Sequence, residues 1–413
     1  MGKGKRAETG GLPFKKLWRA SQPAWRFILK HKAIFIPAAA GALALILLLT
    51  LLFGPGGRGQ PPQEPAEPSP SPSSSPSPPP SPPPPPSPPP SPEPSPLFAP
   101  NPLSGLPLEN EEVLVNRPVA VMHNNSWDIK KDGTIGRQHA LPMYGISRAD
   151  VIYEVMAEGN ITRMLALYQD ISAIPKIGAV RSTRTYYLEL ALAYDAILIH
   201  AGGSPQAYAN IKDWSADTFD GTRAYSSYFW RDTGDRPNVV SEHTLFTSGE
   251  TLLELINKIS RLTVPEGFEN GLRFNGEASL SGGAANIVKA PFSSAKPTWF
   301  FYNQEDSLYY VEEYGSEFID GETGEQIAVT NLLILQTTVG LIPGDKEGRL
   351  NVDLTSGGKG FYAAGGSYIP ILWSRESYNA PFSYAYEDGS PLEMCPGRTY
   401  VCVTGKENTP VFE

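Results

Sequence analysis

The sequence predicts an α+β or α/β segment followed by a small all-β segment, both carried on an N-terminal transmembrane helix and a Pro/Ser-rich linker. Three observations support this prediction: an uncharged apolar run at residues 33–53, a proline-rich stretch at 54–100, and the loss of helical periodicity after residue 285. The folded part therefore divides into residues 101–262 and 285–413, which a Gly/Asn/Ser-rich connection joins.

The N-terminal region predicts a membrane anchor. Residues 1–32 carry nine Lys and Arg residues against the single acid Glu8. The next 21 residues, 33–53, hold no charge and can span a bilayer at about 1.5 Å per residue. Because the basic residues precede the run, the N-terminus is expected in the cytoplasm and the later segments outside the cell membrane. A cleaved signal peptide is the alternative, but the run is long for one and no small-x-small cleavage pattern follows it.

The stretch at 54–100 predicts a disordered, semi-rigid stalk. Roughly half of its residues are proline, and serine fills most of the rest. Such a segment favours polyproline II and reaches on the order of 140 Å when extended. It would hold the folded segments away from the membrane, within or beyond a cell wall. A proline-rich ligand for another domain is the alternative.

Charge excludes some partners. The net charge is −9, and removing the basic N-terminus leaves about −17 on the remainder. An acidic body argues against nucleic acid and against docking on an anionic lipid surface. The histidines after the stalk are scattered without metal-ligand spacing, so we predict neither a metal nor a cofactor.

A hairpin is predicted over residues 150–169. With a two-residue Gly159-Asn160 turn, Glu154 and Glu158 would share one face with Arg163, and an ion pair is expected. Two carboxylates and an arginine on one face are compatible with a binding site or with a neutralised, solvated face.

Residues 177–205 carry the strongest indication of a site. Two arginines precede a predicted helix at 185–193, a strand at 196–200 follows, and a Gly-Gly-Ser turn opens a second helix at 205–214. Arginine forks and helix-start N–H groups together favour an anion. The candidate ligand-binding residues are Arg181, Ser182, Arg184, Glu154, Glu158, Arg163, His200, Gly202, Gly203, Ser204 and His243. Alternatively, the arginines pair with internal acids such as Asp150, Glu154 or Glu158.

The remaining elements follow from turn and capping patterns. His243 falls in a predicted strand at 238–246, and a capping box at 247–250 precedes a helix ending near residue 259. After residue 285 short β-like runs alternate with turns, which predicts a small sandwich or barrel. Cys395 and Cys402 flank a turn signal at 396–398, and on a hairpin centred there both thiols would lie on the same face. Both a disulfide and two buried free thiols are compatible with the pattern.

Several motifs resemble those of a known family. They include RPVAVM at 117–122, GISRADVIYE at 145–154, EGNITR at 158–163, IGAVRSTR at 177–184 and GKGFY at 358–362. Together with PGRTY at 396–400, the chain resembles the YerB-like lipoprotein family of Gram-positive bacteria, a domain of unknown function with distinct N- and C-terminal parts. The resemblance implies an extracytoplasmic location. Here a transmembrane helix replaces the family's frequent lipid-attachment cysteine.

Three functions remain open from the sequence. The first is binding of an anionic wall-derived ligand, such as a cell-wall glycan, peptide or anionic polymer, in an arginine-containing cleft. The second is a protein–protein interaction or scaffold module of the envelope. The third is a hydrolase of envelope material, with His200, His243 or His123 as base, a glutamate as acid, and Ser182 or Ser204 as nucleophile. No familiar catalytic motif accompanies these residues, so the sequence does not decide whether the protein is an enzyme.

Overall fold

The computed structural model describes residues 99–413, apart from 109, 235–236 and 276–279. All of the described residues belong to one compact unit. The predicted segments at 1–32, 33–53 and most of 54–100 lie outside them. Within the described part of the chain, no helix is both long and apolar enough to cross a membrane.

The first part of the folded chain mixes strands and helices. Its strands are β1 (Val119–Asn125), β2 (Val151–Met156), β3 (Thr162–Tyr168), β4 (Ile177–Gly178), β5 (Ile197–His200), β6 (Thr218–Asp220), β7 (Trp230–Arg231) and β8 (Leu245–Thr247). Its α-helices are α4 (Thr185–Leu192), α5 (Pro205–Asp213) and α6 (Gly249–Ile256).

The second part is all β. Every regular element that the structure assigns in residues 280–413 is a strand, as the loss of helical periodicity predicted. These strands are β9 (Gly283–Ala284), β10 (Ile287–Pro291), β11 (Pro297–Asn303), β12 (Leu308–Glu313), β13 (Ser316–Glu317), β14 (Ala328–Val329), β15 (Asn331–Thr337), β16 (Val339–Leu341), β17 (Leu350–Val352), β18 (Gly358–Ala364), β19 (Ser367–Ser374), β20 (Ser383–Ala385), β21 (Thr399–Gly405) and β22 (Val411–Phe412).

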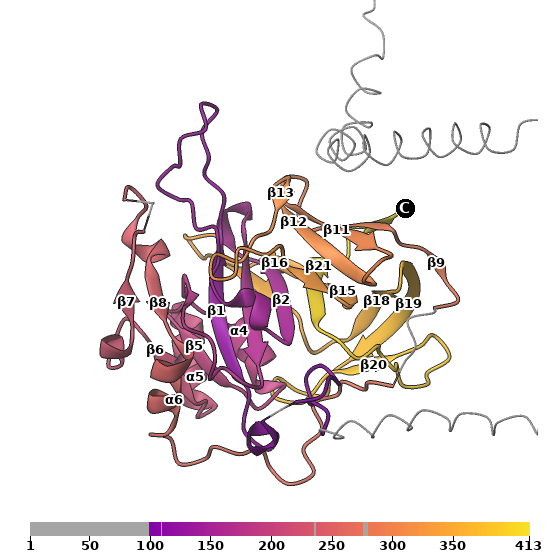
Figure 1. Cartoon of the computed structure of the whole chain (residues 1–413), viewed down its shortest axis with the longest axis horizontal. Coiled ribbons are helices and arrows are strands. Elements are labelled where there is room, and N and C mark those ends of the chain that lie inside the picture. The colour runs from indigo at the N-terminus through magenta and orange to yellow at the C-terminus, as the bar shows by residue number, and fades with distance from the viewer. Residues whose placement is uncertain (1–98, 109, 235–236, 276–279) are drawn as a thin grey trace, which may run out of the picture. The chain divides into compact units, whose positions relative to one another are not determined.

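One mixed sheet runs through both parts. Its order across the described residues is β20-β19-β18-β15-β21-β2-β3-β1-β5-β6, with β9 added to β19. Strand β21 pairs in parallel with both β2 and β15, so a late strand joins the two parts (Figure 1). Strands β1, β5 and β6 are also mutually parallel, and α4 and α5 lie in the connections from β4 to β5 and from β5 to β6. The bounds 101–262 and 285–413 remain predictions as domain limits.

The central strands are buried on both faces. In β15, Leu332 and Ile334 join one hydrophobic cluster, while Leu333 and Leu335 join the other. Both faces of this strand therefore need apolar side chains, which explains its continuous apolar run. Helix α4 covers one face, where Tyr187 and Leu190 pack.

A second sheet covers the other face. Its order is β13-β12-β11-β10-β22, with β14 added to β12. Phe300 and Val311 of this sheet belong to the same cluster as Tyr400 of the large sheet, and the rings of Phe300 and Tyr400 lie 5.1 Å apart edge to face. The predicted β segment is thus divided between these two packed sheets and the separate β16–β17 hairpin.

Two capping predictions have different outcomes. Ser204 caps α5, because its side chain accepts a hydrogen bond from Ala207 N, as predicted. The cap of α6 is Ser248 rather than Thr247, with Thr251 N as donor, and the helix ends at Ile256. The side chain of Thr247 instead donates to Tyr228 O, which removes it from capping.

The two cysteines are buried free thiols on opposite faces of the large sheet. Cys402 lies in β21 and faces the second sheet, whereas Cys395 belongs to the cluster on the α4 face. The predicted turn at 396–398 is not a hairpin, because both neighbours of β21 run parallel to it. A shared face for the two thiols was therefore a wrong expectation.

Candidate functional site

The candidate residues gather at the edge of the sheet where three parallel strands end. Strands β1, β5 and β6 all finish there, and ligands of open α/β sheets bind at such carboxyl ends. Arg181 N donates to Met122 O in the middle of β1, level with the end of β5, and Thr183 N donates to Gly202 O after β5. The arginine segment and the Gly-Gly-Ser turn therefore lie side by side, although the sequence separates them by a helix and a strand.

Two of the arginines share one carboxylate. Arg163 Nη2 lies 3.1 Å from Glu158 Oε1, and Arg184 Nε lies 3.2 Å from Glu158 Oε2. Arg184 Nη2 also contacts Glu158 Oε1. Arg163 Nη1 further donates to Ser182 O at 3.0 Å, which fixes the approach to α4. The pairing with an internal acid that was considered from the sequence is thus present for Arg184, with Glu158 as the acid.

A third arginine completes what we call the arginine cluster, Arg163, Arg181 and Arg184. Arg181 Nη2 lies 2.9 Å from Glu242 Oε1, and the Glu242 side chain is about half exposed at 47%. Burial and the neighbouring Arg163 lower the pKa of Arg181 to about 10, against the attraction of Glu242. The arginine cluster therefore has three positive charges, and its two glutamate partners carry two negative charges. The remaining positive charge favours binding of an anion.

Glu154 lies elsewhere, and its predicted pairing with Arg163 is wrong. In the register of β2 and β3, Glu154 lies opposite Met164, and Val155 lies opposite Arg163. The hairpin loop holds five residues rather than two, because Gly159 and Asn160 both adopt positive φ inside a short 3-10 turn. A one-residue change in register moves every side chain to the opposite face.

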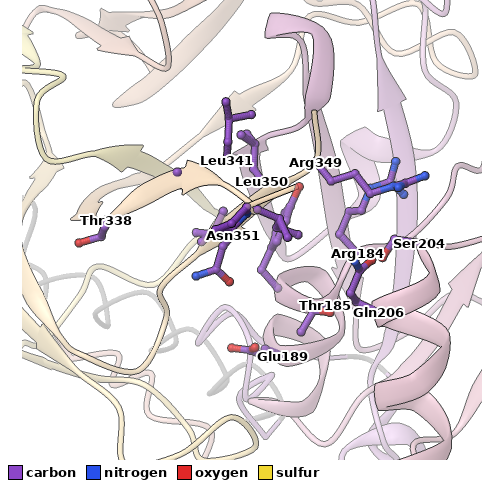
Figure 2. Close-up of a pocket in the computed structure, with 15 residues that line it drawn as sticks. Arg184, Thr185, Glu189, Ser204, Gln206, Thr338, Leu341, Arg349, Leu350 and Asn351 are labelled. Carbon is purple, nitrogen blue, oxygen red and sulfur yellow. The ribbon is translucent and has the colours of Figure 1, made fainter. Parts of the chain in front are cut away.

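A cavity of about 410 Å³ opens beside the arginine cluster. Its residues come from the starts of α4 and α5 and from the β16–β17 hairpin: Arg184, Thr185, Tyr186, Glu189, Ser204, Gln206, Thr338, Gly340, Leu341, Ile342, Pro343, Arg349, Leu350, Asn351 and Val352. Figure 2 shows Arg184 and Arg349 on the same side of this cavity, near Ser204 and Gln206, with Leu341 and Leu350 across from them. The cavity thus has one cationic side and one apolar side.

The two cationic side chains influence each other. Burial lowers the pKa of Arg184, and the positive charge of Arg349 lowers it further, although nearby tyrosines and Asp345 oppose this. Arg349 Nη1 is held by Asp345 Oδ2 at 3.0 Å, and its side chain remains 23% exposed. At the far end, burial raises the pKa of Glu189 to about 7 against the attraction of Arg375.

The turn after β5 is held by Asp220. Gly202 N donates to Asp220 Oδ1 at 2.9 Å, and Gly202 has a φ of 82°, which disfavours other residues. This N–H is therefore committed to Asp220, so in this arrangement it cannot donate to an oxyanion. Beside it, Gly203 pairs with Thr183 in an isolated parallel bridge.

The serine and histidine candidates make structural hydrogen bonds. Ser182 Oγ donates to Ala201 O at 2.8 Å, and His200 Nδ1 lies 2.8 Å from Gly202 O. His200 is only 1% exposed, and burial lowers its pKa. These contacts fix the loop between β5 and α5.

His243 lies in a 3-10 turn at Ser241–His243, before β8, rather than in a strand. Its Nδ1 lies 2.6 Å from Asn124 Nδ2, and its Nε2 lies 3.1 Å from Gln138 Oε1. The neutral tautomer with a proton on Nε2 satisfies both contacts. His123, one residue before Asn124, has a pKa lowered to about 4, mainly by burial.

A second polar group, which we call the acid–lysine cluster, lies between the two sheets. It consists of Glu154, Lys296 and Glu313, each at most 1% exposed. Lys296 Nζ lies 2.7 Å from Glu154 Oε1 and 2.5 Å from Glu313 Oε2. Thr298 Oγ1 and Tyr400 OH donate to Glu154 Oε2 at 2.7 and 2.8 Å.

The two glutamates of the acid–lysine cluster differ in how strongly their charged forms are stabilised. Burial opposes ionisation of Glu154, but Lys296 and the hydroxyl donors outweigh it and lower the pKa of Glu154. Burial and repulsion from Glu154 raise the pKa of Glu313 to about 7. Burial also opposes the charge on Lys296, and attraction to both glutamates raises its pKa.

Sequence reasoning missed four of these residues: Lys296, Glu313, Arg349 and Glu242. Lys296 is the one that the sequence could have indicated, because it stands alone between small residues and an apolar Pro-Thr-Trp-Phe-Phe run. The others reach their partners through distant parts of the chain. No group of three or more metal-ligating side chains occurs in the described residues.

The fold and the site define a mixed α/β protein with an arginine-lined cavity. The chain belongs to the YerB-like family: residues 103–261 match the N-terminal domain, and residues 288–401 the C-terminal domain, of the protein of unknown function DUF3048. It is 30% identical over 304 residues to "Putative lipoprotein YerB" of Bacillus subtilis (strain 168), covering 73% of this chain and 84% of that protein. The crystal structure of YerB from Bacillus subtilis matches with a TM-score of 0.61 at 28% identity, covering 76% of this chain and 99% of that one.

Proposed function

We propose that this chain is a membrane-anchored extracytoplasmic protein of the cell envelope that binds an anionic wall-derived ligand. The predicted apolar run at 33–53 and the stalk at 54–100 support the anchoring, and the relative's name as a lipoprotein supports the extracytoplasmic location.

The observation that carries the binding proposal is the cavity with Arg184 and Arg349 on one side. Its volume falls within the range of small-molecule sites. The first turns of α4 and α5 contribute Thr185 and Gln206 to its lining, and helix N-termini favour negative charge. A phosphate or carboxylate would contact the arginines, and the apolar hairpin would contact the uncharged part of the ligand.

Binding calorimetry would test this proposal. Muropeptides, teichoic acid fragments and inorganic phosphate would be titrated into wild-type protein, Arg349→Ala and Arg184→Ala. The matched control is Arg148→Ala, because Arg148 is exposed and does not line the cavity. We expect Arg349→Ala to lose binding while its unfolding temperature stays the same. The control variant should bind as the wild type does.

Arg184→Ala separates a ligand role from a structural one. It removes a partner of the partly buried Glu158, so it is expected to lower stability as well as binding. If every probe binds Arg349→Ala as tightly as wild type, or if none binds the wild type, the cavity is not the anion site.

A further inference from the structure

The side chain of Asn125 lies against the acid–lysine cluster. Asn125 Nδ2 lies 3.3 Å from Glu154 Oε1 and 2.8 Å from Thr162 Oγ1, and Asn125 also hydrogen-bonds Glu313. Glu154 Oε1 is the same atom that holds Lys296 Nζ at 2.7 Å. One carboxylate oxygen therefore bridges a primary amine and a carboxamide, and Glu313 touches both as well.

This arrangement is shielded from solvent. Asn125 and Glu154 are fully buried, and Lys296 is 1% exposed. The rings of Phe292 and Tyr314 lie 5.3 and 5.0 Å from Lys296 Nζ. Asn125 Oδ1 is buried and accepts no hydrogen bond from the described residues. The Lys296 amine and the Asn125 carboxamide thus contact the same buried carboxylate oxygen, Glu154 Oε1, and two groups held next to each other away from solvent react at high effective concentration.

We propose that Lys296 and Asn125 are joined by an intramolecular isopeptide bond, with Glu154 accepting the proton that frees the amine. In this step the Lys296 ammonium gives one proton to Glu154, and the amine lone pair attacks Asn125 Cγ. The new Nζ–Cγ bond forms as the Cγ–Nδ2 bond breaks. Nδ2 takes a second proton from Nζ and leaves as ammonia, and Glu154 retains the first proton.

The surrounding groups suit this exchange. No oxidant or other co-reactant is consumed, since one amide replaces another and ammonia is the only product released. Glu313 has a raised pKa, so its protonated form is accessible near neutral pH and can donate to Asn125 Oδ1 as negative charge develops there. The product leaves a neutral amide between two protonated acids, which a buried site tolerates better than isolated charges.

The bond would connect the two sheets covalently. Asn125 ends β1 in the large sheet, and Lys296 directly precedes β11 in the second sheet. The alternative is that Lys296 remains an ammonium ion in a buried ion pair and no covalent chemistry takes place.

Peptide mass mapping of the full-length protein distinguishes these two states. After trypsin digestion, an isopeptide bond gives one branched peptide containing both residues, lighter by about 17 Da than the two linear peptides together, because ammonia is lost. Two linear peptides of full mass overturn the proposal. A branched peptide lighter by about 18 Da, as loss of water to a glutamate would give, overturns the assignment to Asn125.

Variants test the roles of the residues. Asn125→Ala and Lys296→Met each remove one reactant, and Glu154→Gln keeps both while removing the proton acceptor. All three are expected to give only linear peptides, whereas Lys289→Met, a half-buried lysine in β10, should retain the branched one. A branched peptide in Glu154→Gln would overturn the role of Glu154. The wild-type map decides on the bond itself even if a variant fails to fold.

Discussion

Lys296 lies 2.7 Å from Glu154 across the space between the two sheets, although 142 residues separate them in the sequence. The two side chains are completely or almost completely buried. The strand register places Glu154 on the face of the large sheet toward the second sheet, and the turn before β11 places Lys296 opposite it. A single lysine therefore neutralises charge at the contact between the sheets.

Replacing Lys296 with methionine should strongly destabilise the protein. In the ion-paired state that the structure shows, the change leaves Glu154 and Glu313 buried with no cation, and losing one partner of a buried ion pair costs about 3–5 kcal/mol. Urea denaturation followed by circular dichroism would measure the loss in free energy of unfolding. Lys212→Met on the exposed end of α5 is the control, expected within about 0.5 kcal/mol of wild type. Equal midpoints for the two variants would contradict the role of Lys296.

His123 should make stability depend on pH below neutrality. Burial lowers its pKa from 6.5 to about 4, although Asp320 and the Gly178 backbone oppose the shift. Between these values the unfolded chain binds the proton more readily, so stability falls as pH drops from about 6.5 towards 4, by up to about 3 kcal/mol. Above pH 6.5 this contribution is constant.

His123→Gln removes this titration while other ionisable groups stay the same. Denaturation midpoints measured from pH 4 to pH 7 should therefore rise less steeply with pH in the variant than in wild type. Parallel curves for the two proteins would show that His123 is not the titrating group.

Ser204 should stabilise α5 through its cap. Its side chain accepts a hydrogen bond from Ala207 N at 3.1 Å, and losing such a cap typically costs about 1 kcal/mol. Thermal unfolding of Ser204→Ala should show this loss. Ser226→Ala, at an exposed serine whose 3-10 turn lacks a side-chain cap, should change little. A loss of the same size in both variants would argue against capping as the cause.

Gly249 and Gly340 should respond oppositely to alanine. A Cβ at Gly249 would lie 1.7 Å from Ile171 O, so the backbone at the start of α6 must move. Such overpacking typically costs about 1–3 kcal/mol. At Gly340 nothing lies within 4 Å and φ is not positive, so alanine should be neutral or slightly stabilising. Chemical denaturation of the two variants compares them directly, and a tolerated Gly249→Ala would contradict the predicted clash.

Local sequence patterns were sufficient to predict those helices and strands whose formation depends on residues close by in the sequence. The hairpin at 150–169 appears as β2 and β3, and the helix after Ser204 appears as α5. The register of the hairpin was not predictable from the turn residues alone. Gly159-Asn160 is compatible with a two-residue turn and with the longer five-residue loop. Only the longer loop gives the register in which the Glu154 side chain lies on the same side of the sheet as Lys296.

Long-range contacts explain most of what the sequence could not show. Residues of the arginine segment were predictable as a group because they lie within one β-α-β stretch. Arg349 lines the cavity only because the β16–β17 hairpin approaches the starts of α4 and α5. Periodicity within one strand carries no information about which distant strand lies beside it.

The position of β21 also determines when the large sheet can be assembled during folding. This strand, Thr399–Gly405, lies between β2 and β15 and donates and accepts backbone hydrogen bonds on both sides. Until it has been synthesised, β2 and β15 each have an exposed edge, and exposed edges invite pairing with other chains. Contacts of such large sequence separation also fold slowly. The nascent chain must therefore be kept from aggregating until residues 399–405 are available.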